Sequence, residues 1–196
     1  MEKQLIERKD VDKLFLKMPS DRDFPQLLDG LEASAEIDDE PFLMHDKIKE
    51  SYEQSPAQYF ARLNDLKGGW EFKQKDGTVR TGLPQITRWS FIDEVMVGTI
   101  NLRWQNGTNE LPEYVIGHIG YQIFPKYRGL GLATQQLTLM KELAKEVGLD
   151  LLYISHRIEN LASQKVILRN GGIFIEDITV LPEHGGWKGK SYKIPL

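Results

Sequence analysis

The segment from Ile123 to Thr134 constrains the fold of this chain most strongly. An apolar, strand-like run from Tyr114 to Phe124 leads into it, and a helix-like run from Ala133 to Val147 leaves it. Gly129 and Gly131 lie at the junction. The first N–H groups of a helix have no partner and carry partial positive charge, so they suit a phosphate or pyrophosphate. The junction therefore predicts a binding site for a phosphorylated small molecule.

Two better-known phosphate motifs do not fit this junction. A Walker A loop needs a lysine and a hydroxyl residue after its second glycine, and both are missing. A dinucleotide fingerprint needs a third glycine where this chain has Thr134 or Gln135, and it belongs to a first βαβ unit, whereas this loop follows four expected strands. A tight turn without a ligand stays an alternative on the residues alone.

Composition places the chain among ordinary soluble proteins. Its 196 residues fit one domain, and 40% hydrophobic and 28% charged residues can build a buried core. The net charge is -4 and no dense Lys/Arg block occurs, which argues against a nucleic-acid or anionic-membrane surface. There is no apolar run of the roughly 20 residues that a membrane span needs, and no signal peptide. Together with the absence of cysteine, this predicts a cytoplasmic protein without disulfides or thiolate ligands.

Apolar periodicity and turn residues predict the element order β-α-α-β-β-β-α-β-α-β-β, an α/β or α+β domain with a mixed sheet. The expected strands are 13–18, 87–93, 95–104, 114–124, 150–156, 173–180 and 191–194. The expected helices run from about residue 20 to 35, 56 to 66, 133 to 147 and 160 to 169, with Ser55 and Asn160 as N-caps of the second and fourth. Residues 36–40 and 70–85 are expected to be loops, the latter with a turn at Asp76-Gly77.

Three motifs resemble those of the GNAT-type acyl-CoA N-acyltransferases. Arg128-x-x-Gly131-x-Ala133, preceded by Pro125-Lys126-Tyr127, is similar to the family signature. Asn160-x-x-Ser163, followed by Asn170-Gly171-Gly172, resembles the family's later helix and its end. Gly117-His118-Ile119-Gly120-Tyr121 resembles a strand of acetyltransferases that modify ribosomal-protein N-termini, and is most like predicted bacterial acetyltransferases with a Gly-His-Ile-Gly-Tyr strand. The resemblance extends from Trp89 to Ile175.

The resemblance implies a fold, a domain plan and a co-substrate. The fold would be a GNAT-like mixed, mostly antiparallel central sheet of six to seven strands, flanked by about four helices. Residues 1–196 would form one domain, with a variable acceptor-side half over 1–85 and an acyl-CoA-binding core over 86–180. Acetyl-CoA would be the co-substrate, with no metal, and a homodimer is one option for the assembly.

The same resemblance assigns residues to the cofactor. Backbone groups of Ile123 and Phe124 would pair with the pantetheine arm, and N–H groups of Gly129, Gly131, Leu132 and Ala133 would bind the pyrophosphate. Side chains of Arg128 and Thr134 would contact phosphate, although a solvated arginine and an ordinary helix residue are the simpler alternatives. Asn160 would orient the pantetheine, act as an N-cap, or do both. Ser163 would contact the cofactor sulfur.

The implied reaction is direct attack of an amine on the thioester in a ternary complex, without an acyl-enzyme. His118 stands where relatives often have Glu, and its ordinary pKa of about 6.5 suits a general base, although packing or hydrogen bonding on the sheet is the slightly favoured alternative. Tyr121 and Ser163 are the other catalytic candidates, because the tyrosine that many relatives use is here Ile167. Glu94 and Glu113 are further candidates for the base.

The acceptor is expected to be a primary amine of a small molecule, an amino acid or a protein N-terminus. The first two helices and their acidic loop would line its pocket, although a solvated loop and a packed core explain the same residues: Glu36, Asp38, Asp39, Glu40, Phe42, Tyr52, Tyr59, Phe60 and Trp70. Alternatives are another acceptor or acyl group, a non-catalytic acyl-CoA sensor, and a nucleotide-binding protein.

Overall fold

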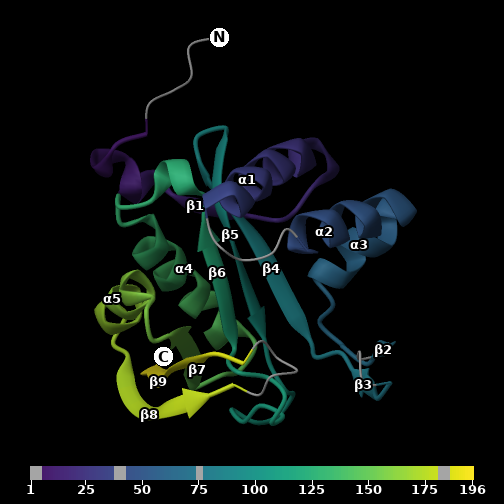
Figure 1. Ribbon diagram of the computed structural model, residues 1–196, viewed down its shortest axis with the longest axis vertical. Helices are drawn as coiled ribbons and strands as arrows, with labels where there is room; N and C mark the ends of the chain where they lie inside the picture. Colours follow the sequence, from purple (N-terminus) through teal and green to yellow (C-terminus); the bar gives the residue numbers. More distant parts are fainter. Residues whose placement is uncertain (1–5, 38–42, 74–76, 181–185) are drawn as a thin grey trace.

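The computed structural model describes residues 6–37, 43–73, 77–180 and 186–196 (Figure 1). Its strands are β1 (Phe15–Lys17), β2 (Glu71–Lys73), β3 (Val79–Thr81), β4 (Gln85–Ile92), β5 (Val95–Arg103), β6 (Ile119–Ile123), β7 (Leu151–Arg157), β8 (Ile173–Thr179) and β9 (Lys188–Pro195). Its α-helices are α1 (Phe24–Ile37), α2 (Leu43–Gln54), α3 (Pro56–Leu63), α4 (Leu132–Glu146) and α5 (Leu161–Arg169). Three short 3-10 helices cover Arg8–Lys13, Asp21–Asp23 and Pro125–Tyr127.

The strands form two main sheets that meet at one junction. The first has the order β1-β4-β5-β6, and the second has the order β7-β9-β8. β2 and β3 make a separate hairpin, and every ladder between described strands is antiparallel. This confirms the expected mixed α/β fold with a mostly antiparallel sheet.

Between β6 and β7 no ladder forms in the described chain, and the two sheets touch mainly at the start of β6. There the backbone N–H of His118 donates to the carbonyl oxygen of Tyr153, in β7, over 2.8 Å. The hydroxyl of Ser155 donates to the carbonyl oxygen of Ile116 over 3.1 Å. Beyond this junction the facing edges of β6 and β7 are not hydrogen-bonded to each other. The fold thus leaves backbone donors and acceptors of β6 without a strand partner on that side.

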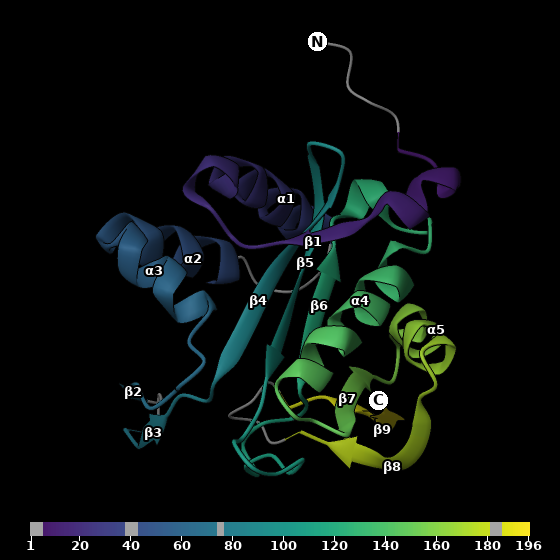
Figure 2. The same ribbon diagram turned by 180° about the vertical axis from the view of Figure 1, so that it is seen from behind.

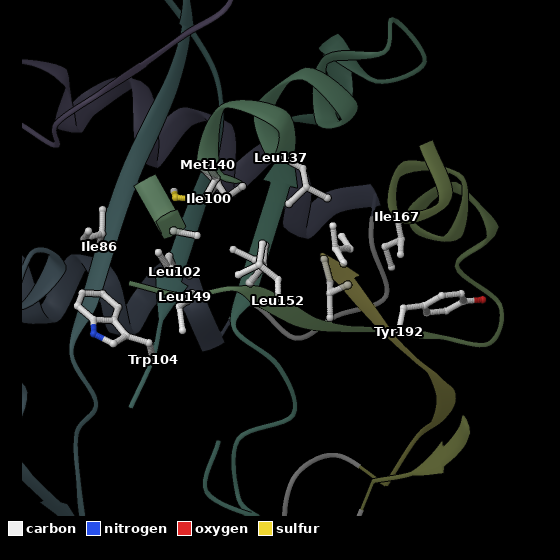
Figure 3. Close-up of a cluster of buried hydrophobic side chains, with 14 residues drawn as sticks. Ile86, Ile100, Leu102, Trp104, Leu137, Met140, Leu149, Leu152, Ile167 and Tyr192 are labelled. Atoms are coloured by element: carbon white, nitrogen blue, oxygen red, sulfur yellow. The ribbon is translucent and has the colours of Figure 1, made fainter. Parts of the chain in front are cut away.

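Helix α4 covers one face of the first sheet, as Figure 2 shows. Its fully buried Leu137 and Met140 belong to a cluster with Leu102 of β5 and with Leu152 and Ile154 of β7, drawn in Figure 3. The cluster therefore joins the two sheets through one shared core.

A second cluster lies on the other face of β4 and β5. Phe24 and Leu27 of α1 and Tyr59 of α3 pack there against Trp89 and Phe91 of β4. β4 is consequently buried on both faces over most of its length.

Three elements differ from the sequence-based expectations. The strand expected over 114–124 is limited to β6. Just before it the chain approaches β7 closely: a Cβ at Gly117 would lie 3.0 Å from the carbonyl oxygen of Tyr153. Residues 70–85, expected as a loop, contain the β2–β3 hairpin. Helix α2 was not expected, because its sequence is mostly polar; Tyr52 anchors it by stacking on Phe24 with ring centroids 3.7 Å apart.

Candidate active site

The turn before α4 has a left-handed backbone at both of its glycines. Gly129 has a φ of 78°, and Gly131, the N-cap of α4, has a φ of 101°. Both values lie in the left-handed region, where residues with a Cβ are strained. A Cβ built on either glycine would meet no heavy atom within 4 Å. Open space therefore lies directly against this backbone.

The amides of this turn have no acceptor in the part of the chain that the structure describes. Among the described residues, the N–H groups of positions 129–133 donate no hydrogen bond to a backbone carbonyl, whereas those of Thr134 and Gln135 both donate to Gly131. No side chain caps α4 at Gly131. Unsatisfied donors at a helix N-terminus carry the positive end of the helix dipole. Unbonded N–H donors at the N-terminus of α4 are a suitable binding site for an anion.

Arg128 links this turn to the preceding strand. Its Nε donates to the carbonyl oxygen of Ile123 over 2.9 Å. The arginine therefore holds the turn next to the end of β6, in addition to any contact it makes with a ligand.

The hydrogen-bond pattern of β6 decides which of its backbone groups face the gap between β6 and β7. The N–H of Phe124 donates to Val97 over 2.9 Å, and the carbonyl of His118 accepts from Arg103. Since alternate residues of a strand point their backbone groups to opposite sides, those of Tyr121 and Ile123 face away from β5. The N–H of Phe124 is used inside the sheet, so the role in pantetheine pairing suggested for Phe124 does not fit this geometry. The N–H of Ile123 fits that role, while the carbonyl of Ile123 already accepts from Arg128.

Three sequence-predicted residues come together across the gap. The hydroxyl of Tyr121, on β6, lies 2.7 Å from Oγ of Ser163, on α5. The side chain of Asn160 accepts from the backbone N–H of Ser163 over 2.9 Å and caps the helix, as expected. Burial raises the pKa of Tyr121 to about 12. The phenol therefore keeps its proton near neutrality and is a hydrogen-bond and proton donor rather than a base.

His118 lies at the junction of the two sheets. It is fully buried, and its Nδ1 accepts a 2.8 Å hydrogen bond from the backbone N–H of Tyr153. Burial lowers the pKa of His118 to about 4, with a smaller contribution from the nearby charge of Arg103. A lone pair held in this way cannot receive a proton from an amine, so the geometry favours the packing role of His118 over that of general base.

The remaining candidates are scattered. Ile167 is fully buried in the core. Glu94 lies at the β4–β5 turn beside Arg22. Tyr59 belongs to the cluster around Phe24, with Tyr52 and Phe60 packed against it. Of the acidic loop and its neighbour, residues 38–40 and 42 lie outside the described part of the chain.

Glu113 lies elsewhere, at a cavity of about 520 Å³ beside the sheet junction. Besides Glu113, its walls include Ser155 of β7, Ser191 of β9 and Glu176 of β8. The sequence predicts the acceptor side at the first two expected helices, which correspond to α1 and α3. The signal that points to this cavity is the alternation of polar and apolar residues along β7, which leaves one face of the second sheet polar.

Over the described ranges, no three His, Cys, Asp or Glu side chains gather closely enough to hold a metal ion. None of the described helices combines the length and the apolar character needed to cross a bilayer.

The comparisons with known proteins agree with this geometry. A family model described as an acetyltransferase (GNAT) domain matches residues 13–173. No curated protein sequence is significantly similar to the chain. Since the family model covers most of the chain, the protein belongs to the GNAT acetyltransferases and is an acyltransferase.

Solved structures with the same fold include three acetyltransferases. The microcin C7 self immunity acetyltransferase MccE, in complex with acetyl-CoA and AMP, has a TM-score of 0.62 at 12% identity, covering 96% of this chain and 95% of that one. RimL, a ribosomal L7/L12 alpha-N-protein acetyltransferase in complex with coenzyme A, has a TM-score of 0.64 at 15% identity, covering 93% and 94%. An acetyltransferase from Salmonella typhimurium that modifies the N-terminal serine of L7/L12 has a TM-score of 0.61 at 14% identity, covering 93% and 95%.

Proposed function

We propose that the protein is an N-acetyltransferase that moves an acetyl group from acetyl-CoA to a primary amine in a ternary complex. The observation that carries this proposal is the row of amides at positions 129–133, which have no acceptor among the described residues and lie beside the unpaired edge of β6. The row of amides suits a diphosphate, and the unpaired edge of β6 suits an extended, amide-containing arm. Acetyl-CoA contains both groups.

Different residues bind different parts of acetyl-CoA. N–H groups of Gly129, Gly131, Leu132 and Ala133 bind the pyrophosphate, with the hydroxyl of Thr134 in the first turn of α4 close behind. The backbone of Ile123 pairs with the pantetheine arm, which then lies between β6 and β7 and leads to Tyr121 and Ser163. Asn160 fixes the start of α5 and so holds Ser163 in place.

The chemistry follows from the Tyr121–Ser163 pair. A neutral amine nitrogen attacks the thioester carbonyl, a C–N bond forms, and the C–S bond breaks to release the thiolate of coenzyme A. The hydroxyl of Ser163 gives its proton to that thiolate, and Tyr121 replaces it through their 2.7 Å contact. Tyr121 regains a proton from water when coenzyme A leaves. The raised pKa of Tyr121 keeps this proton available near neutral pH. The proton lost by the amine leaves on the acceptor side.

Two measurements test the proposal. Isothermal titration with acetyl-CoA should show binding, and release of free thiol should follow when a panel of primary amines is added. The panel includes free amino acids, peptides with a free N-terminus, and hydroxyl compounds as matched non-amine acceptors. Binding without thiol release for any amine would refute the catalytic proposal, and thiol release only with hydroxyl acceptors would replace the amine by an alcohol.

A further inference from the structure

The cavity beside the sheet junction is built from both halves of the chain. It has a volume of about 520 Å³, within the range of small-molecule sites. The carbonyl of Ile116 in its wall accepts from the hydroxyl of Ser155. The N–H of His118, two residues after Ile116, donates to the carbonyl of Tyr153, two residues before Ser155. The cavity therefore adjoins the point where the gap between β6 and β7 closes.

One wall of the cavity is a row of polar side chains across the second sheet. Ser155, Ser191 and Glu176 are direct cross-strand partners on β7, β9 and β8, so they share one face. Glu176 follows a register shift in β8, where an irregular strand redirects its side chains. Glu113 reaches the cavity from the segment that precedes β6.

Neither carboxylate is used by the fold. Among the described residues, the side chains of Glu113 and Glu176 make no hydrogen bond and no ion pair, although the chain has several surface ion pairs elsewhere. Two carboxylates that share a cavity and have no ion-pair partner among the described residues favour a positively charged occupant.

The cavity also contains one cation of its own. Arg80, from the β2–β3 hairpin, stacks on the ring of Tyr114 with its guanidinium carbon 4.4 Å from the ring centroid. No described acidic side chain pairs with Arg80. The guanidinium is planar, and with one face against the ring its N–H groups at the edges remain available to a carboxylate.

We infer that this cavity is the acceptor site and that the acceptor is a small zwitterionic amine of the amino-acid type. Its ammonium group binds Glu113 and Glu176, and its carboxylate binds Arg80, with the two serines as hydrogen-bond partners. This inference rests on the proposed acetyltransferase function and narrows its substrate class. Before attack, the ammonium loses one proton to a cavity carboxylate, which passes it to water, and the lone pair then forms the C–N bond.

The test uses the full chain and matched pairs of acceptors, each a free L-amino acid and its amide. The wild-type enzyme should prefer the free acid in kcat/KM. Arg80→Gln should reduce that preference by about tenfold or more, because a charge-assisted bond is lost only with the free acid. The double variant Glu113→Gln and Glu176→Gln should raise the acceptor KM about tenfold or more for both compounds.

Controls separate this inference from the proposed function. Glu142→Gln removes an exposed carboxylate on α4, paired only with Lys145, and should change nothing. In every variant the Kd for acetyl-CoA should stay at the wild-type value, which also shows that the variants fold.

Two outcomes overturn the inference while the acetyltransferase function stands: acceptor KM values that the double glutamine variant leaves unchanged, and equal or better use of amides and peptide N-termini by the wild type. Failure of every amine, despite acetyl-CoA binding, overturns the proposed function and the inference with it.

Discussion

Gly131→Asp is the sharpest perturbation of the proposed cofactor site. Gly131 is the N-cap of α4 at a φ of 101°, with open space where a side chain would project. Aspartate is a good N-cap residue in ordinary geometry, and here its carboxylate would lie among the unbonded amides. It would therefore occupy the place of the phosphate and repel it.

The size of the effect follows from Coulomb's law. Two unit charges about 5 Å apart interact by about 0.8 kcal/mol in water and about 3.3 kcal/mol at an effective dielectric constant of about 20. A diphosphate carries about two such charges, so the loss is at least about 1.6 kcal/mol. The Kd for acetyl-CoA should therefore rise by at least about tenfold.

Isothermal titration measures this loss directly. Gly107→Asp is the matched control, because Gly107 also has a positive φ, of 77°, and open space around it, but lies in a turn away from the site. Circular dichroism reports whether each variant is folded. A folded Gly131→Asp protein with the same Kd as Gly107→Asp would show that the phosphate does not bind at this turn.

Three further predictions concern the site and the core. Tyr121→Phe should lower kcat about 10²-fold with little change in the Kd for acetyl-CoA, and an unchanged kcat would remove Tyr121 from proton transfer. Because the pKa of His118 falls from 6.5 to about 4 on folding, the unfolded chain binds more protons between these values. The free energy of unfolding should then decrease as the pH falls through that window, by up to about 3 kcal/mol, and denaturant titrations should give a flatter profile for His118→Asn. An equal slope in both proteins would contradict this. Leu137→Ala, at a fully buried position, should lower the free energy of unfolding by about 3 kcal/mol in the same titrations, and a loss under about 1 kcal/mol would contradict the packing of α4.

Features that depend on neighbouring residues were predictable from the sequence. The positive φ angles of Gly129 and Gly131, and the caps at Ser55 and Asn160, follow from residue types within one turn of helix. The strands and helices after residue 85 also carried clear periodicity. Local chemistry thus predicted most of the fold and the glycine turn before α4.

Features that depend on distant partners were not predictable. The role of His118 is set by a backbone N–H that lies 35 positions away in the sequence, and that of Tyr121 by a hydroxyl 42 positions away. Helix α2 has few apolar residues and is fixed by the stacking of Tyr52 on Phe24. Such contacts appear only once the chain has folded.

The pairing of β1 with β4 has a consequence for how such a protein diversifies. Lys17 lies opposite Trp89, so the intervening stretch of chain begins and ends in neighbouring strands of one sheet. Lengthening a flexible stretch whose ends are already fixed is inexpensive, since doubling it costs only about 0.6 kcal/mol of closure entropy. Evolution can therefore insert or remodel hairpins and helices there while the remainder of the molecule keeps its geometry.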